Sequence, residues 1–211
     1  TKDITRLNLS GYGIADLTPL SGMKLVYLDC SDNNLTSLAG LDGMPLEVLG
    51  CSGNRITSLD PLRGMPLQTL FCQENLIRDL SPLDSESLID LNCSWNRLSS
   101  LDSLRGFALD RLLCRGNGIV SLEPLRGMPL QRLDAGLNPL DSLEPLRGMP
   151  LEFLRLDGTN ISDLSPLRGM PLAVLGLYNC QKIRDISPIL ELGTLEVLSI
   201  SETTEGIRRL K

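Results

Sequence analysis

The 211-residue sequence predicts a solenoid of the α/β type, mostly β, in which short parallel strands alternate with a narrow 3₁₀ or extended return arm. Two observations predict this fold class. Five cysteines recur at intervals of 21 residues, at Cys30, Cys51, Cys72, Cys93 and Cys114. A leucine-rich frame recurs at the same interval, and a fixed period of about 20 to 29 residues is typical of proteins whose repeats stack on one another.

Aligning the cysteines divides the chain into about ten units. These units begin near Ile4, Leu25, Leu46, Leu67, Leu88, Leu109, Leu130, Leu151, Leu172 and Leu195. Because such an array grows by stacking, we expect residues 1–211 to form a single domain. Since the chain starts and stops at repeats, we also expect it to be a segment of a longer protein.

The first part of each unit predicts a short strand. In the third unit, Leu49 and Cys51 alternate with Val48, Gly50 and Ser52, which is the period of a strand with one face turned inward. Successive strands are expected to pair in parallel and form a curved right-handed sheet. Nothing in so short a unit can cover the outward side of the strands, so we expect an uncovered concave face.

The second part of each unit predicts the return arm. Apolar residues recur there at every third position, as on a 3₁₀ turn or a polyproline-like arc, at Ile56, Leu59, Leu62 and Met65. Asp60, Ser81 and Ser165 each precede a proline, and we expect their side chains to cap the short helices that begin there.

An asparagine recurs at the corner where the strand turns away. It is found at Asn33, Asn54, Asn75, Asn96, Asn117 and Asn138. A side-chain amide carries both donors and acceptors, so we expect these residues to satisfy the backbone of neighbouring turns rather than to bind a ligand. Thr159, Cys180 and Thr203 replace the asparagine late in the array.

The repeated frame L-x-x-L-x-C-x-x-N-x-I-x-x-L-x-P-L-x-G-M-P resembles the leucine-rich repeat. Its spacing and its Pro-Leu-x-x-Met-Pro tail are most similar to the short repeats of bacterial internalin-like proteins. Similar arrays also occur as appendages of bacterial signalling proteins such as Ser/Thr kinases. The resemblance implies a protein-binding scaffold, or alternatively a structural spacer or regulatory appendage of a larger bacterial surface or signalling protein.

The cysteine column permits two interpretations, metal or redox chemistry and core filling. Ala135, Leu156, Leu177 and Ile200 occupy the same column in later units, so we expect buried, inert thiols and no metal site. Free thiols favour a cytoplasmic location slightly, whereas the internalin-like resemblance favours the cell surface or secretion.

Composition excludes several classes of function. The net charge of −6 argues against nucleic-acid binding, and no apolar run is long enough for membrane insertion. The chain has no histidine, and its aspartates lie on an open face, so we expect no catalytic residues, no cofactor and no enzyme activity.

Arginines on the return arm suggest either an anion-binding stripe or solvated salt bridges. Acidic residues stand three positions before three of these arginines, which favours salt bridges. The pairs are Asp102 with Arg105, Glu123 with Arg126 and Glu144 with Arg147.

The concave face is where we expect a protein or peptide ligand. Five of the seven aromatic residues fall on it or at its edge, together with several arginines, which is the composition of an interface hot spot. The predicted partner-binding residues are Tyr27, Phe71, Trp95, Arg111, Leu113, Arg115, Arg132, Asp134, Phe153, Arg155 and Tyr178.

The alternative is that these side chains only satisfy one another. Asp134 should lie beside Arg155, and Arg132 could stack on Phe153. Neither end of the array carries a recognisable polar cap, so end-to-end association is a further expectation, whereas the sequence leaves the oligomeric state open.

Overall fold

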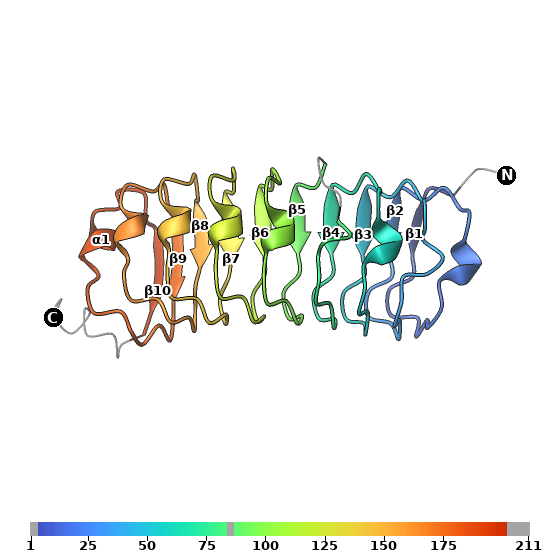
Figure 1. Ribbon diagram of the computed structural model, residues 1–211, viewed down its shortest axis with the longest axis horizontal. Coiled ribbons are helices and arrows are strands. Elements are labelled where there is room, and N and C mark those ends of the chain that lie inside the picture. Colours follow the sequence, from blue (N-terminus) through green and yellow to red (C-terminus); the bar gives the residue numbers. More distant parts are fainter. Residues whose placement is uncertain (1–3, 84–86, 202–211) are drawn as a thin grey trace. The chain divides into compact units, whose positions relative to one another are not determined.

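The computed structural model describes residues 4–83 and 87–201, which divide into two compact units. Unit 1 contains the described residues up to 98 together with 107–109, and unit 2 contains 99–106 and the described residues from 110 onward. Within each unit the strands follow one another in chain order, and the short helices lie on the return segments (Figure 1). The organisation of residues 1–211 as a single domain stays a prediction.

Unit 1 contains five strands that pair in parallel, each with the next. They are β1 (Arg6–Asn8), β2 (Tyr27–Asp29), β3 (Val48–Gly50), β4 (Thr69–Phe71) and β5 (Asp90–Asn92). Two 3₁₀ helices lie on the return segments, η1 (Thr18–Leu20) and η2 (Asp60–Leu62). Each residue of β1 to β4 pairs with the residue 21 positions later, so the register follows the repeat.

Unit 2 also contains five parallel strands. They are β6 (Arg111–Leu113), β7 (Arg132–Asp134), β8 (Phe153–Arg155), β9 (Val174–Leu177) and β10 (Val197–Ile200). Its return segments carry η3 (Asp102–Leu104), η4 (Glu123–Leu125), η5 (Glu144–Leu146), η6 (Ser165–Leu167) and the helix α1 (Ser187–Leu190). Val174 of β9 pairs with Val197 of β10, so the longer unit keeps its strands in register.

The core consists of the inward positions that the periodicity predicts. Leu49 and Cys51 of the strand segment are 0% exposed, and Leu59 and Met65 of the return arm are 0% and 3% exposed. The mostly β fold class with a 3₁₀ return arm is therefore confirmed.

The predicted helix caps are wrong. Asp60 and Ser165 are the first residues of their helices and do not cap them. The capping group comes from two positions earlier, because the backbone N–H of Asp60 donates to Ser58 Oγ at 3.0 Å and that of Ser165 donates to Asp163 Oδ1 at 2.8 Å. The same arrangement joins the N–H of Ser81 to Asp79. Proline is the second residue of η2 and η6, so the N-cap residues are Leu59 and Leu164, each one position before the residue that the proline position suggested.

The asparagine at each corner satisfies backbone groups of its own repeat and of its neighbours, as predicted. Nδ2 of Asn54 donates to the carbonyl oxygens of Cys51 and Ser52 in its own repeat and of Cys30 in the preceding one, at 3.0–3.1 Å. Its Oδ1 accepts the N–H of Leu35 at 2.9 Å. One side chain therefore joins two successive turns.

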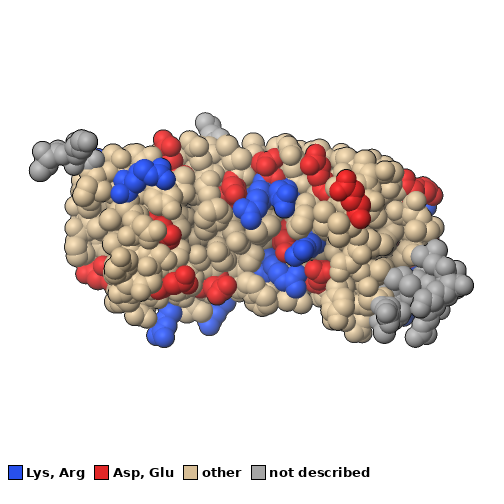
Figure 2. Space-filling model, turned by 180° about the vertical axis from the view of Figure 1, so that it is seen from behind, with Lys and Arg blue, Asp and Glu red and all other residues tan. Residues whose placement is uncertain are grey.

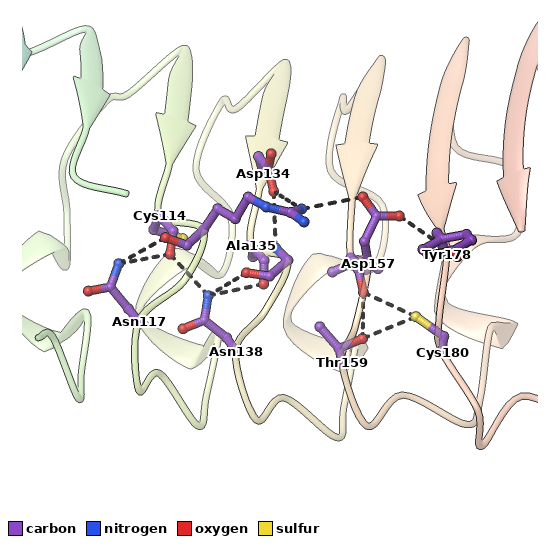
Figure 3. A network of polar contacts seen from close by, with 12 residues as sticks. Cys114, Asn117, Asp134, Ala135, Asn138, Asp157, Thr159, Tyr178 and Cys180 are labelled. Carbon is purple, nitrogen blue, oxygen red and sulfur yellow. Dashed lines mark hydrogen bonds and ion pairs between the residues drawn. The ribbon is translucent and has the colours of Figure 1, made fainter. Parts of the chain in front are cut away.

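The late replacements preserve only part of this pattern. Thr159 Oγ1 donates to the carbonyl oxygen of Leu156 at 2.8 Å, and Cys180 Sγ donates to the same oxygen at 3.1 Å (Figure 3). Thr203 lies outside the described residues. A hydroxyl or thiol has fewer donors than an amide, so the backbone bonds in this region are fewer per repeat.

Replacing Asn138 with alanine is expected to lower the free energy of unfolding by about 3 kcal/mol, since several buried backbone groups lose their partners at once. Asn138 is 2% exposed and bonds to the carbonyl oxygens of Cys114, Ala135 and Gly136 and to the N–H of Ile119. Urea denaturation followed by circular dichroism measures the change. Asn160→Ala is the control, because Asn160 is exposed; equal losses in the two variants would contradict the assigned role.

Candidate functional site

The first and last residues of each three-residue strand point away from the core. We call these side chains, together with the outward residue two positions further along the chain (such as Gln73, Arg115, Asp157 and Tyr178), the outer strand face of unit 1 (β1 to β5) and of unit 2 (β6 to β9). The central leucines Leu28, Leu49, Leu112 and Leu133 are 0% exposed, whereas most flanking residues are half-buried or exposed. The strand period therefore separates core residues from candidate contact residues.

In unit 1 the structure places Tyr27 and Phe71 on the outer strand face, both half-buried. The guanidinium of Arg6 lies 4.3 Å from the centre of the Tyr27 ring, a cation–π distance. Tyr27 and Phe71 line the same hollow, which has a volume of about 230 Å³. Two of the three aromatic residues predicted in this unit are thus brought together.

Trp95 lies apart from that hollow, in the turn that follows β5. Its backbone φ is +56°, and 49% of the residue is exposed. The ring lines a shallow depression beside Glu74, Asn75 and Leu76, and Asn54 also borders it. The structure therefore gives unit 1 two separate aromatic sites.

In unit 2 an aromatic ring stacks with two arginines. The guanidinium of Arg132 lies 4.6 Å from the centre of the Phe153 ring, and that of Arg155 lies 5.3 Å from it. Arg132 pairs with Phe153 in register across β7 and β8. Both arginines remain exposed, so their charge faces solvent while their planes cover the ring.

A second group in unit 2 is an ion cluster around Arg115. Nη1 of Arg115 lies 3.4 Å from Asp157 Oδ2 and 3.8 Å from Asp134 Oδ1. Asp157 Oδ1 also accepts the backbone N–H of Tyr178 at 2.8 Å (Figure 3). Burial raises the pKa of the Asp134 carboxyl, while the N–H of Gly136 and the charge of Arg115 act in the opposite direction.

The sequence interpretation placed Asp134 beside Arg155, and the two residues do pair in register. The ion pair that forms, however, runs to Arg115, whose side chain reaches across from the preceding repeat. Asp157 was not among the predicted site residues. It stands in the same outward column as Arg115, two repeats later, which is the one signal that could have identified it.

The remaining predicted residues have different surroundings. Arg111 and Leu113 are the two outward residues of β6 and are half-buried. Tyr178 directly follows β9 and is 62% exposed. It is the most exposed aromatic residue of unit 2 in the described part of the chain.

The cysteine column lies in the core, as predicted. All six cysteines are free and buried. Burial raises the pKa of the Cys30 and Cys93 thiols to about 12 and that of Cys51 and Cys72 well above the ordinary value. Across residues 4–83 and 87–201, no group of three or more His, Cys, Asp or Glu side chains could hold a metal ion.

The arginines of the return arm form the predicted salt bridges. Their distances are 2.9 Å for Arg105–Asp102, 2.6 Å for Arg126–Glu123 and 2.5 Å for Arg147–Glu144. Arg168 pairs with Glu191 at 2.6 Å, a partner that the sequence interpretation did not name. All of these groups are well exposed, so each pair contributes little to stability.

Charged side chains of both signs lie near one another on the face drawn in Figure 2. Seen from behind, Lys and Arg side chains lie next to Asp and Glu side chains and form no continuous basic area (Figure 2). In the described part of the chain, no helix has the length and apolarity needed to cross a membrane.

Comparison with solved structures finds that this chain is similar to leucine-rich repeat proteins. The internalin InlF of Listeria monocytogenes superposes with a TM-score of 0.77 at 20% identity, over 90% of this chain and 67% of its own. Internalin C2 of Listeria monocytogenes gives 0.58 at 21% identity, over 84% and 81%. The functional domain of InlJ from Listeria monocytogenes, which includes a cysteine ladder, gives 0.65 at 22% identity, over 95% and 54%.

The fold is that of the internalin-like leucine-rich repeats. No protein-family model and no curated protein sequence matches this chain. The chain spans 54% of the InlJ domain, and at these identities the likeness concerns the internalin-like fold alone.

The buried thiols make the stability of this repeat fold sensitive to alkali. The pKa values of the Cys30, Cys51, Cys72 and Cys93 thiols in the folded state lie above the unfolded value of about 8.5, so the contribution of these four thiols is complete below that pH and is lost as the pH rises toward 12. We expect each thiol to lower the free energy of unfolding by about 1.4 kcal/mol per pH unit in this range.

Urea denaturation of the wild type and of Cys51→Ala between pH 7 and pH 11 tests this expectation. The two proteins differ in one titratable group only, so the difference between the two slopes isolates the Cys51 thiol. Parallel slopes would show that Cys51 ionises without a penalty and is not enclosed by the core.

Proposed function

We propose that the chain is a protein-binding scaffold and that its outer strand faces recognise a protein or peptide partner. The observation that carries the proposal is the stack of Arg132, Phe153 and Arg155 on the outer strand face of unit 2. Arginine and aromatic residues are the types most enriched in the energetic centres of interfaces. A preformed stack loses little side-chain entropy when a partner binds.

The other proposed contact residues support the same use of the strand faces. Tyr178 adds an exposed ring in unit 2, and Arg111 and Leu113 add a charged and an apolar group on β6. Tyr27, Phe71 and Trp95 supply the aromatic groups of unit 1. Arg115 and Asp134 are half-buried in their ion cluster, and we propose that they shape the surface beside Tyr178.

We propose a protein ligand rather than a nucleic acid because the net charge is −6 and, on the face drawn in Figure 2, acidic side chains lie beside the basic ones. Proteins that bind nucleic acid place a continuous basic stripe against the phosphates. We likewise propose that the chain binds its partner without catalysing a reaction and without a cofactor.

One observation favours the alternative role of a spacer or regulatory appendage in a larger protein. Arg115 pairs with Asp134 and Asp157 of its own chain, so this part of the strand face satisfies its own charges. A spacer needs only such internal pairing. Replacement of strand-face residues would then leave every interaction of the full-length protein unchanged.

A photoreactive benzophenone side chain at position 178 is expected to cross-link to a single protein partner in an extract of the source cells. The same side chain at position 147, on the return arm, is the control. Phe153→Ala is then expected to weaken binding of the purified partner about 30-fold, the effect of losing a hot spot of about 2 kcal/mol.

Phe107→Ala is the matched variant, since Phe107 is also half-buried but lies on the return segment before β6. Isothermal titration calorimetry measures both affinities, and circular dichroism verifies that both variants fold. A Phe153→Ala variant that binds as tightly as the wild type would refute the use of this face and support the spacer.

A further inference from the structure

The hollow on the outer strand face of unit 1 is centred on a strand residue without a side chain. Asp29 of β2, Gly50 of β3 and Phe71 of β4 pair with one another in register and form one row across three strands. Neighbouring strands lie about 4.8 Å apart, so Asp29 and Phe71 are separated by about twice that distance with only the Gly50 backbone between them. The row therefore has a carboxylate on one side and an aromatic ring on the other.

The Asp29 carboxylate points toward this gap. A Cβ atom placed on Gly50 would lie 2.9 Å from Asp29 Oδ1. The same oxygen accepts the backbone N–H of Ser31 at 3.0 Å. Among the residues that the structure describes, Asp29 forms no ion pair, so its negative charge is uncompensated at the hollow.

Gln73 also lines the hollow. Its Oε1 is buried from solvent and has no hydrogen-bond donor among the described residues, so this oxygen is not open to a ligand in the hollow. The hydroxyl of Ser52 donates to Ser31 Oγ at 3.0 Å. The Asp29 carboxylate is therefore the charged acceptor at the hollow.

The aromatic walls favour a cation as the donor. Tyr27 and Phe71 both line the hollow, and ring faces attract cations electrostatically. Arg6 stacks on Tyr27 but is not among the residues that line the hollow. A hollow with a negative charge and two rings is complementary to a positively charged group that carries several N–H donors.

The chain itself shows such a cation over a glycine in unit 2. A Cβ atom placed on Gly136 would meet Nη1 of Arg115 at 2.5 Å and Oδ1 of Asp134 at 3.3 Å. The Arg115 guanidinium therefore occupies the space above Gly136 beside an aspartate. The hollow at Gly50 combines the same elements, a bare glycine backbone and an aspartate, and adds aromatic walls.

We propose that the hollow at Gly50 receives an arginine side chain of the protein partner, an inference that rests on the proposed use of the outer strand faces in protein binding. The planar guanidinium stacks on Phe71 and donates to the Asp29 carboxylate. Arginine fits better than lysine, because its N–H donors lie in one plane and can reach the carboxylate while the plane covers the ring.

The test uses N-acetyl-arginine N-methylamide as the probe and the full chain labelled with ¹⁵N. The backbone amide signals of Gly50 and Ser52 are expected to shift in a saturable manner. The neutral citrulline analogue, which has the same shape, is expected to bind at least about tenfold more weakly, because it lacks the charge that Asp29 and the rings recognise. Equal binding of the two probes would overturn the proposal.

Gly50→Ala fills the hollow and is expected to weaken binding of the arginine probe at least about tenfold. Gly176→Ala is the matched control, because Gly176 ends the same Val-Leu-Gly sequence in β9 and lies in unit 2. In both variants the new methyl group meets side-chain atoms that can move, so both are expected to fold. Asp29→Asn retains the acceptor for the N–H of Ser31, removes the charge and should weaken binding as well.

The two proposals fail separately. If the arginine probe binds at Gly50 but Phe153→Ala leaves the affinity for the cross-linked partner unchanged, the guanidinium site stands and the proposed function fails. If Phe153→Ala weakens the partner while the arginine probe leaves the Gly50 signal unmoved, the hollow has no affinity for guanidinium and this inference is refuted.

Discussion

The corner asparagine is the interaction on which the rest of this structure depends. Its Nδ2 group joins carbonyl oxygens of two successive repeats, and its Oδ1 accepts an N–H of the preceding turn, as Asn54 shows. The bonds hold the turns at one spacing, and where the repeat is 21 residues long each strand residue pairs with the residue 21 positions later, as in β2 and β3. Because the register is constant, each column of the sequence has one environment, either core or strand face.

The sequence was sufficient to predict the features that depend only on the position of a residue within its repeat. The inward leucines, the buried cysteines, the asparagine bonds and the salt bridges of the return arm all follow from period and residue type. The helix caps were misassigned, because they depend on where the first helical residue falls, and proline alone does not determine that position.

The candidate site could be predicted only as a set of residues. Arg115 reaches Asp157 two repeats later, a contact that depends on the length and rotamer of a flexible side chain and on the absence of a side chain at Gly136. The buried oxygen of Gln73 likewise results from how its neighbours pack. The repeat pattern of the sequence identifies which side chains lie on the same strand face. The structure shows which of these side chains are in contact. The two strand faces differ in this respect: an arginine neutralises the aspartates in unit 2, and Asp29 has no such partner in unit 1.

The turn after each strand from β1 to β9 contains a residue in the left-handed region at a corresponding position, and its identity varies along the array. Glycine holds this position at Gly53, Gly116 and Gly158, where it adopts a positive φ without steric cost. Trp95 has the same conformation at φ +56°, which disfavours a residue with a Cβ by about 1 kcal/mol. The array thus places a bulky indole ring at a position whose backbone conformation favours glycine. A Trp95→Gly substitution relieves the strain in this turn and at the same time removes the indole from the surface. The stability of the turn and the contacts of the surface therefore change in opposite directions.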